Sequence, residues 1–192
     1  MVKAVTSNTP KRILFDAGSI HKGLKYVEGT GWNFEESFVG ATSGGSKFTI
    51  TPEIYKIPVD RANVNVMGLT KKTGETATME INFAELTKDL IKSTIIGVDG
   101  TSEDEMYDLI ESKANIEEGD YWENIAYVGE TVEGEKIIVI LDNALCTSGL
   151  PIEGKAKAEG VATVTFECYA KLDGDHDKLP YHIYTPKSLG TN

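Results

Sequence analysis

The sequence predicts a mainly β protein, an antiparallel β-sandwich or barrel with one α-helix packed on its flank. The pattern of Ala62–Lys92 is that of a hairpin that leads into a helix, and Glu135–Cys146 and Gly160–Ala170 have the composition of strands. Several short strands joined by hairpins are typical of a sandwich or barrel. A chain of 192 residues suits one domain with its own core.

The hairpin segment is predicted in most detail. Its first arm alternates around Val64 and Val66, and a polar turn follows at Lys71–Gly74. In the return arm the apolar row is Ala77, Met79, Ile81 and Phe83, and the polar row is Thr76, Thr78, Glu80 and Asn82. Such alternation indicates a strand with one buried face, so we expect the apolar row in the core. A helical period and a capping box of Asn82 with Glu85 then predict a helix at about Phe83–Lys92.

Two more strands, Tyr121–Thr131 and Glu135–Cys146, flank a turn at Val132–Gly134. The run Ile137–Leu141 is apolar on both faces, so the helix, another sheet or another subunit should cover its second face. In Gly160–Ala170 the residues expected to point inward are Ala162, Val164, Phe166, Cys168 and Ala170. Shorter strands are predicted at Lys11–Asp16 and Leu150–Lys157.

The remaining segments are predicted as connections and arms. The spacing of glycines predicts a loop at Ala17–Gly31 and a flexible joint at Phe38–Lys47. The pattern of Ser102–Ala114 predicts a short helix or a helical loop. Phe48–Val59 contains Pro52 and Pro58, which favour an edge strand or an extended loop. We therefore expect one domain over residues 1–172, with an N-terminal arm at about 1–9, a long loop at about 38–60 and a C-terminal arm at 173–192.

Charge and cysteine content narrow the functional classes. A net charge of −11 argues against bulk electrostatic attraction to nucleic acid or to an anionic membrane. Cys146 and Cys168 lie in predicted strands and are expected to be buried free thiols. The first residues lack the apolar run of a signal peptide, and no stretch has the length of a transmembrane helix, so we expect a protein made in a cytoplasm and kept there or released by lysis.

Motifs for metal binding and catalysis are weak. The histidines His21, His176 and His182 are expected in solvated loops, which makes a structural zinc site improbable. Asp173, Asp175 and Asp177 have the spacing that opens a calcium loop, but Lys178 and Tyr184 occupy the positions of its glycine and glutamate. We therefore expect no metal and no cofactor.

Patterns for phosphate binding and for nucleophilic catalysis are incomplete. Gly40–Lys47 nearly matches a phosphate-binding loop, but Ser46 precedes Lys47, the reverse of the motif. Ser19 and Ser43 have no evident base near them in the sequence. We therefore expect that the protein is not an enzyme.

Three stretches resemble a known family. They are Val59–Thr87, then Gly160–Leu172 followed by Pro180–Tyr184, and the extended stretch Phe48–Val59 with its pair Pro52–Glu53. These stretches are similar to segments of the major tail proteins of long-tailed, non-contractile phages of Gram-positive bacteria. Those proteins are the subunits of the tail tube. The resemblance covers most of the chain beyond about Phe38.

The resemblance implies a fold and an assembly. The subunit would be a β-sandwich with a helix on its flank, and hexameric rings of it would stack around a tape-measure protein. The tube would end at tail-terminator and tail-tip proteins, and double-stranded DNA would pass through its lumen. The protein would reside in the virion tail, and in the host cytoplasm before assembly, without a membrane partner.

The resemblance also implies roles for residues. The long loop would reach the neighbouring ring, and both terminal arms would add contacts between rings. The residues expected in these contacts are Phe48, Ile50, Pro52, Ile54, Tyr55, Ile57, Tyr181, Ile183 and Tyr184. Those expected to face the lumen are Thr76, Thr78, Glu80 and Asp60. A lumen of net negative potential would let DNA slide instead of binding it.

Other classes remain open at this point. An Ig-like adhesive or carbohydrate-binding sandwich would use exposed aromatic residues, for which Trp32, Trp122 and Tyr121 are the candidates. The sequence alone also does not separate the subunit of a non-contractile tail tube from the tube protein of a contractile tail or of a tail-like bacteriocin. An enzyme on a β scaffold would need an acid, a base and a nucleophile, and the sequence brings no such set together.

Overall fold

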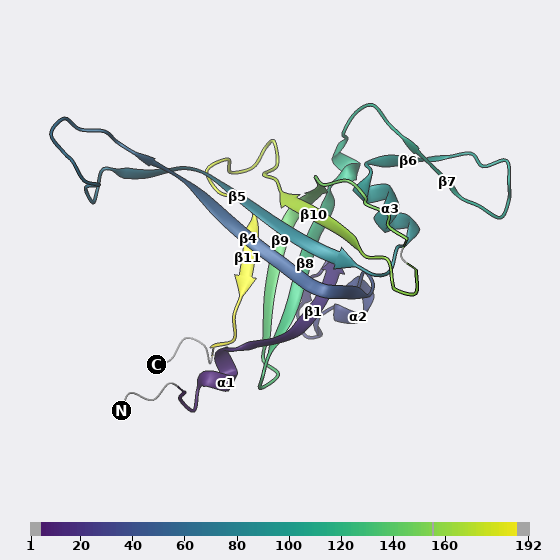
Figure 1. The fold of residues 1–192 in the computed structure, drawn as a ribbon, viewed down its shortest axis with the longest axis horizontal. Helices are drawn as coiled ribbons and strands as arrows, with labels where there is room; N and C mark the ends of the chain where they lie inside the picture. Colours follow the sequence, from purple (N-terminus) through teal and green to yellow (C-terminus); the bar gives the residue numbers. More distant parts are fainter. Residues whose placement is uncertain (1–4, 155, 188–192) are drawn as a thin grey trace.

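The computed structural model describes residues 5–154 and 156–187. One antiparallel sheet dominates it, with seven strands in the order β1-β8-β9-β10-β5-β4 and with β11 paired to β9. Its strands are β1 (Leu14–Lys22), β4 (Thr42–Lys56), β5 (Thr70–Phe83), β8 (Trp122–Thr131), β9 (Lys136–Cys146), β10 (Ala162–Cys168) and β11 (Tyr181–Tyr184). The mainly β class predicted from the sequence is confirmed (Figure 1).

Small elements decorate this sheet. Two two-stranded sheets pair β2 (Tyr26–Val27) with β3 (Gly31–Trp32) and β6 (Gly97–Gly100) with β7 (Leu109–Ser112). The helical elements are α1 (Thr9–Arg12), α2 (Phe34–Ser37), α3 (Lys88–Thr94) and the 3-10 turn η1 (Glu118–Asp120). No helix in the described ranges is long and apolar enough to cross a membrane.

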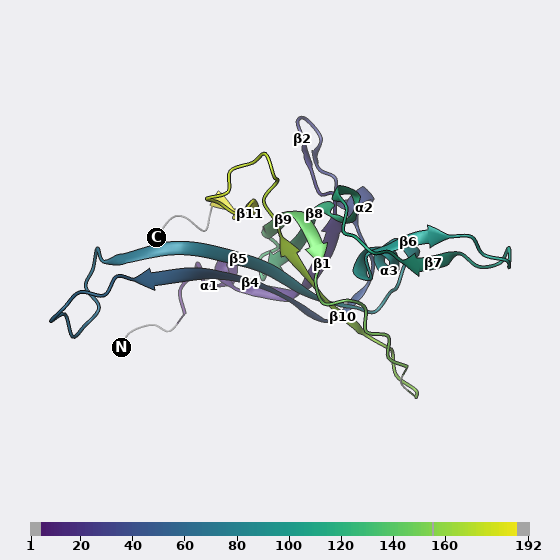
Figure 2. The same cartoon turned by 90° about the horizontal axis from the view of Figure 1, so that it is seen from above.

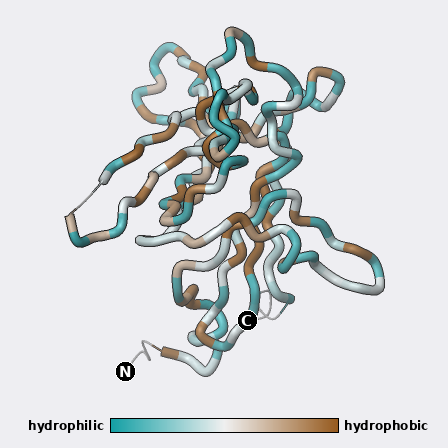
Figure 3. The backbone as a smooth tube through the Cα atoms, turned by 90° about the vertical axis from the view of Figure 1, so that its right-hand side faces the viewer, coloured by the Kyte–Doolittle hydropathy of each residue, from teal (hydrophilic) through white to brown (hydrophobic). Residues whose placement is uncertain are grey.

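The large sheet folds over itself, which makes the architecture sandwich-like. β4 and β5 cross β8 and β9 at a steep angle (Figure 1). The two edges meet where the backbone N–H of Val39 donates to the carbonyl of Ile20 over 3.0 Å and Phe38 bridges to His21. Hydrophobic residues therefore gather along the strands of the body, where the two layers face each other (Figure 3).

The core confirms the apolar rows read from the sequence. Ala77, Met79, Ile81 and Phe83 on β5 are fully buried. On β10 the buried residues are Ala162, Val164, Phe166 and Cys168, whereas Ala170 follows the strand and is exposed, contrary to the prediction. Burying one large aliphatic or aromatic side chain contributes about 1.5–3 kcal/mol, so these two rows are a main source of stability.

β9 is apolar on both faces, as predicted, and the structure shows what covers its second face. Ile138 and Ile140 form a second cluster with Leu24, Ala126 and Val128. Trp32 of β3 and Phe34 of α2 pack over that cluster. The second face of β9 is therefore covered by the small β2–β3 sheet together with α2, and not by the helix α3.

The predicted hairpin of Ala62–Lys92 is wrong in its first arm. β5 already begins at Thr70 and includes the residues predicted as the turn, and its partner is β4, with Pro52 opposite Glu75 and Ile54 opposite Lys72. Pro52 is tolerated because β4 lies at the edge of the sheet, which was one of the two alternatives predicted for Phe48–Val59. The long loop predicted at about 38–60 is wrong, because Thr42–Lys56 of it form β4. The flexible joint predicted at Phe38–Lys47 is wrong from Thr42 onward, because β4 starts there.

The helix is also shorter and later than predicted. Strand β5 extends to Phe83 because β4 and β10 pair with it up to that residue. Asn82 then donates its side-chain amide to the carbonyl of Gly45 over 3.1 Å, and Glu85 accepts from Ala41 over 3.2 Å, so they form no capping box. The helix begins after Thr87, whose Oγ1 accepts from the backbone N–H of Leu90 over 3.2 Å.

Five smaller predictions are also corrected. Lys11 lies in α1, and the predicted loop from Ala17 is strand as far as Lys22, because a bulge at residues 16–18 interrupts the alternation. The helix predicted at Ser102–Ala114 contains strand β7 instead. No strand occurs in the described residues of 150–157. The predicted C-terminal arm contains β11, which pairs with β9 of the same chain.

Candidate assembly surface

The β4–β5 hairpin extends beyond the body of the protein as a two-stranded arm (Figures 1 and 2). Its pairing continues to Lys56 opposite Thr70. The loop 57–69 closes it, and there Ile57 donates its N–H to the carbonyl of Leu69 over 2.8 Å. Two-stranded hairpins with no second layer are marginally stable in water, so a partner surface would stabilise this arm.

Apolar side chains are exposed along the outer part of the arm. We call residues 54–72 the tip. Its exposed large apolar residues are Ile54, Tyr55, Val59, Val64, Val66 and Met67. Val64 is 77% exposed and Met67 is 99% exposed. Exposed apolar residues gathered in one segment mark an interaction surface, since covering them removes apolar area from water at about 25 cal/mol per Å².

The inner half of the hairpin contributes to a polar sheet face. Residues directly opposite each other in an antiparallel pair share a face. Two rows of opposite residues cross β4, β5 and β10. The first row is Lys47, Glu80 and Thr165. The second row is Thr49, Thr78 and Glu167. The polar face of β4, β5 and β10 consists of Lys47, Thr49, Thr51, Thr76, Thr78, Glu80, Asn82, Thr163, Thr165 and Glu167.

This face is ordered by its own hydrogen bonds and lies away from the core. The hydroxyl of Thr163 donates to Oδ1 of Asn82 over 2.7 Å. Thr76, Thr78 and Glu80, which the sequence analysis grouped together, do lie on this one face. Asp60 lies in the loop 57–69 at the far end of the hairpin instead.

The residues predicted for contacts between rings occupy different environments. Phe48, Ile50 and Tyr181 are partly buried against the main core, with the rings of Phe48 and Tyr181 6.5 Å apart. Pro52, Ile54 and Tyr55 are exposed, and Ile57 is partly exposed, on the arm. Ile183 and Tyr184 are exposed on β11, and the ring of Tyr184 lies 5.0 Å from that of Trp32. The arm and β11 are therefore separate surfaces.

His21 is not the solvated loop residue that the sequence predicted. It is 3% exposed on β1. Its Nε2 lies 2.8 Å from Oγ of Ser19 and its Nδ1 lies 2.9 Å from Oγ of Ser37. Because the Ser37 hydroxyl donates to the carbonyl of Asn33 over 2.7 Å, we assign Nδ1 as the protonated nitrogen and Ser19 as the donor to Nε2.

Burial keeps this histidine neutral. Desolvation lowers the pKa of His21, the backbone carbonyl of Phe34 opposes that shift, and the charge of Lys136 lowers the pKa further. Sequence reasoning missed the contact between Ser19 and His21, although alternation along β1 places both side chains on one face. A β1 strand was not predicted there, so that signal was not used.

The two cysteines are buried and free, as predicted. They lie on the adjacent strands β9 and β10, where Cys146 is opposite Phe166 and Cys168 is opposite Ala144. Burial raises the pKa of the Cys168 thiol to about 12, so it is protonated near neutral pH and unreactive.

The aromatic residues that were candidates for sugar binding differ in whether a ligand could reach them. Trp122 is 4% exposed, and its Nε1 donates to Oγ of Ser93 over 2.7 Å. Tyr121 lies with its ring 5.6 Å from that of Tyr169 beside a groove of about 970 Å³. The lining of this groove includes Glu117, Glu118, Glu123, Lys171 and Asp173.

Motifs for metal and phosphate find no support in the geometry. Within the described ranges, no group of three His, Cys, Asp or Glu side chains is placed to hold a metal ion. Asp175 instead accepts from the backbone N–H of Asp177 over 2.9 Å and pairs with Lys178 at 3.7 Å. From Thr42 onward, Gly40–Lys47 is itself part of strand β4, whereas a phosphate-binding loop leads into a helix.

Neither a protein-family model nor a curated protein sequence matches this chain. The geometry of the arm and of the polar face is therefore the basis for assigning a function.

Proposed function

We propose that the chain is a self-assembling structural protein, the tail tube subunit of a long-tailed, non-contractile phage. In this proposal hexameric rings stack into a tube within the virion tail, and double-stranded DNA passes through the lumen. The observation that carries it is the β4–β5 arm, whose outer half is apolar and unpacked in the single chain.

The arm favours assembly over a solitary protein. Its strands pair with each other as far as Lys56 opposite Thr70, with one register shift after Glu53, so it is a formed element and not an unfolded loop. Its six exposed large apolar residues nevertheless contact water in the monomer. A neighbouring subunit that covers them would remove this exposure and stabilise the hairpin at the same time.

The polar face supplies a candidate channel lining. Six of its ten side chains are threonines, which are short, uncharged and suited to strands. One lysine and two glutamates accompany them. A wall of this composition has no cluster of cations to hold phosphates, so DNA would slide along it. The proposal thus places Thr76, Thr78 and Glu80 at the lumen and leaves Asp60 out of it.

The tape-measure, tail-terminator and tail-tip proteins are the partners that this function requires. The proposal assigns the chain no catalytic role and no cofactor. The buried Ser19–His21–Ser37 contact then serves to hold β1 to the segment that contains α2.

Electron microscopy of negatively stained protein tests the proposal. A purified sample at increasing concentration, with preformed tube fragments added as seeds, is expected to give rings or tubes with a regular axial repeat. A protein that stays monomeric at every concentration, seeded or not, would overturn the proposal.

A second candidate is a carbohydrate-binding sandwich, favoured by the groove beside Tyr121 and Tyr169. Tyrosine rings next to carboxylates suit the stacking and hydrogen bonding of a sugar. A glycan array separates the two functions. Binding that Tyr121→Ala and Tyr169→Ala abolish, in a protein that forms no tubes, would favour this candidate.

A further inference from the structure

Charge is distributed unevenly along the molecule. The tip, residues 54–72, has four basic side chains and one carboxylate, a net charge of +3 in a chain whose total is −11. Lys72 pairs with Glu75 at 2.7 Å. Lys56, Arg61 and Lys71 make no ion pair with any residue that the structure describes. The arm is thus both apolar and basic.

The opposite end of the molecule is acidic. We call residues 88–120 the acidic end; it includes α3, the β6–β7 hairpin and η1. It has ten carboxylates and three lysines, a net charge of −7. The tip and the β6–β7 hairpin lie at opposite ends of the longest axis in both views (Figures 1 and 2).

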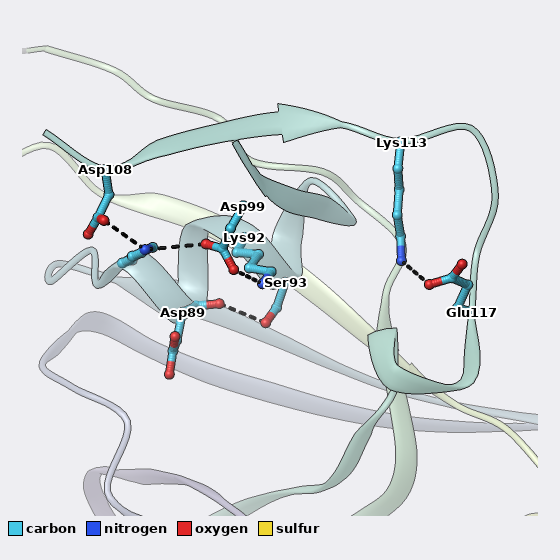
Figure 4. Close-up of polar contacts among 8 residues, drawn as sticks. Asp89, Lys92, Ser93, Asp99, Asp108, Lys113 and Glu117 are labelled. Carbon is cyan, nitrogen blue, oxygen red and sulfur yellow. Dashed lines mark hydrogen bonds and ion pairs between the residues drawn. The ribbon is translucent and has the colours of Figure 1, made fainter. Parts of the chain in front are cut away.

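The lysines of the acidic end are already engaged within it. Lys92 pairs with Asp99, Lys88 pairs with Asp99 and Asp108 at 3.2 and 3.0 Å, and Lys113 pairs with Glu117 at 3.2 Å (Figure 4). Lys113 also pairs with Asp120 at 2.6 Å. The carboxylates that make no ion pair with described residues include Glu103, Glu105 and Glu111. These negative charges are left for an external partner.

The acidic end also exposes apolar side chains. Met106 is 87% exposed and Tyr107 is 71% exposed in the connection between β6 and β7. Ile116, in the segment between β7 and η1, is 53% exposed. Both ends therefore combine exposed apolar residues with charge, and the sign of the charge is opposite at the two ends.

We propose that the tip of one copy docks on the acidic end of the next copy, so that subunits join head to tail along their longest axis. This inference rests on the proposed function and names the two surfaces that meet between rings. A contact between two different surfaces can repeat along an axis without closing, which is what an extending tube requires. Two tips repel each other, as do two acidic ends, so the contact also sets one polarity for the tube.

Charge reversal tests this pairing. The tip variant Arg61→Glu with Lys71→Glu changes the net charge of the tip from +3 to −1. The end variant Glu103→Lys, Glu105→Lys, Glu111→Lys and Glu118→Lys changes the net charge of the acidic end from −7 to +1. Each variant should raise the critical concentration for tubes by about tenfold or more, since like charges then face each other. A chain with both ends reversed should recover assembly, and so should a mixture of the two single-end variants. Lys171→Glu with Lys178→Glu is the matched control and should assemble normally.

Salt and DNA provide independent readouts. Wild-type assembly should weaken between 0.1 and 1 M NaCl, where the Debye length falls from about 10 Å to about 3 Å. Tubes that still form at the wild-type concentration in the tip variant and in the end variant, each tested alone, would overturn this pairing while leaving the tube function intact. A tip that instead binds a DNA duplex, with no rescue by the doubly reversed chain, would also overturn it. Wild-type protein that never assembles contradicts the proposed function itself.

Discussion

His21 illustrates how single residues depend on distant parts of the chain. Its partner Ser19 is two residues away, but Ser37 is sixteen residues away and is brought in by α2. Sequence patterns showed which residues of β5 and β10 are buried, because alternation is local. They did not show that a histidine beside a bulged strand is buried, because the cover comes from another element.

The pH dependence of stability should reveal this buried histidine. The unfolded pKa of His21 is near 6.5 and its folded pKa is lower, so the unfolded chain binds the proton first as pH falls. The contribution of His21 to the free energy of unfolding is therefore present above about pH 6.5 and is lost as pH falls through the folded pKa. Urea unfolding at pH 8, 7, 6 and 5 measures it.

His21→Gln is the variant for comparison. It should lose less stability than the wild type between pH 8 and pH 5. Asp142, whose pKa is raised mainly by burial, titrates in both proteins and cancels in their difference. Equal losses in the two proteins would show that His21 does not sense pH.

At the scale of elements, the strands rich in apolar residues were predictable and the connections were not. β8, β9 and β10 were predicted within two residues of their bounds because their apolar residues alternate or run continuously. β4 was only partly predicted, because its first half is rich in Gly, Ser and Thr and gives no alternation. The turn of the hairpin was misplaced, because Lys71–Gly74 has turn composition but pairs with β4.

The pairing of β4 with β5 defines where the tip can be deleted without disturbing the rest of the hairpin. Replacing Ile54–Thr73 with Asn-Gly joins Glu53 to Gly74, which are already opposite each other, by a turn that favours hairpins. Phe48, Ile50 and the buried row of β5 remain. We expect an unchanged circular dichroism spectrum and cooperative unfolding, but no rings or tubes. A variant that still forms tubes would show that the tip is not the assembly element.

Two point variants provide a matched comparison for the deletion. Met67 in the tip and Leu172 outside it are almost fully exposed, at 99% and 96%. Met67→Ser should raise the critical concentration for assembly, whereas Leu172→Ser should leave it unchanged. Equal effects of both would point to general surface hydrophobicity instead of the tip.

At the scale of the whole molecule, two of the three stretches that carry the resemblance to tail tube proteins lie side by side. The stretch 59–87 contains β5 and the stretch 160–172 contains β10, and these strands are hydrogen-bonded neighbours although about 80 residues separate them. Together they present much of the polar face. No local pattern in the sequence predicts such a pairing, so the strand order could not have been deduced from it. The net charges of residues 54–72 and 88–120 can be counted in the sequence, but their positions at opposite ends of the molecule (Figure 1) could not be deduced from it, because these depend on how the chain folds.

Cryo-electron microscopy of an assembled tube tests the central claim most directly. The account predicts a closed channel lined by the threonine-rich face of β4, β5 and β10, with each tip seated on the acidic end of a subunit in the next ring. A tube whose polar face points outward, or whose channel is lined by other strands, would contradict it.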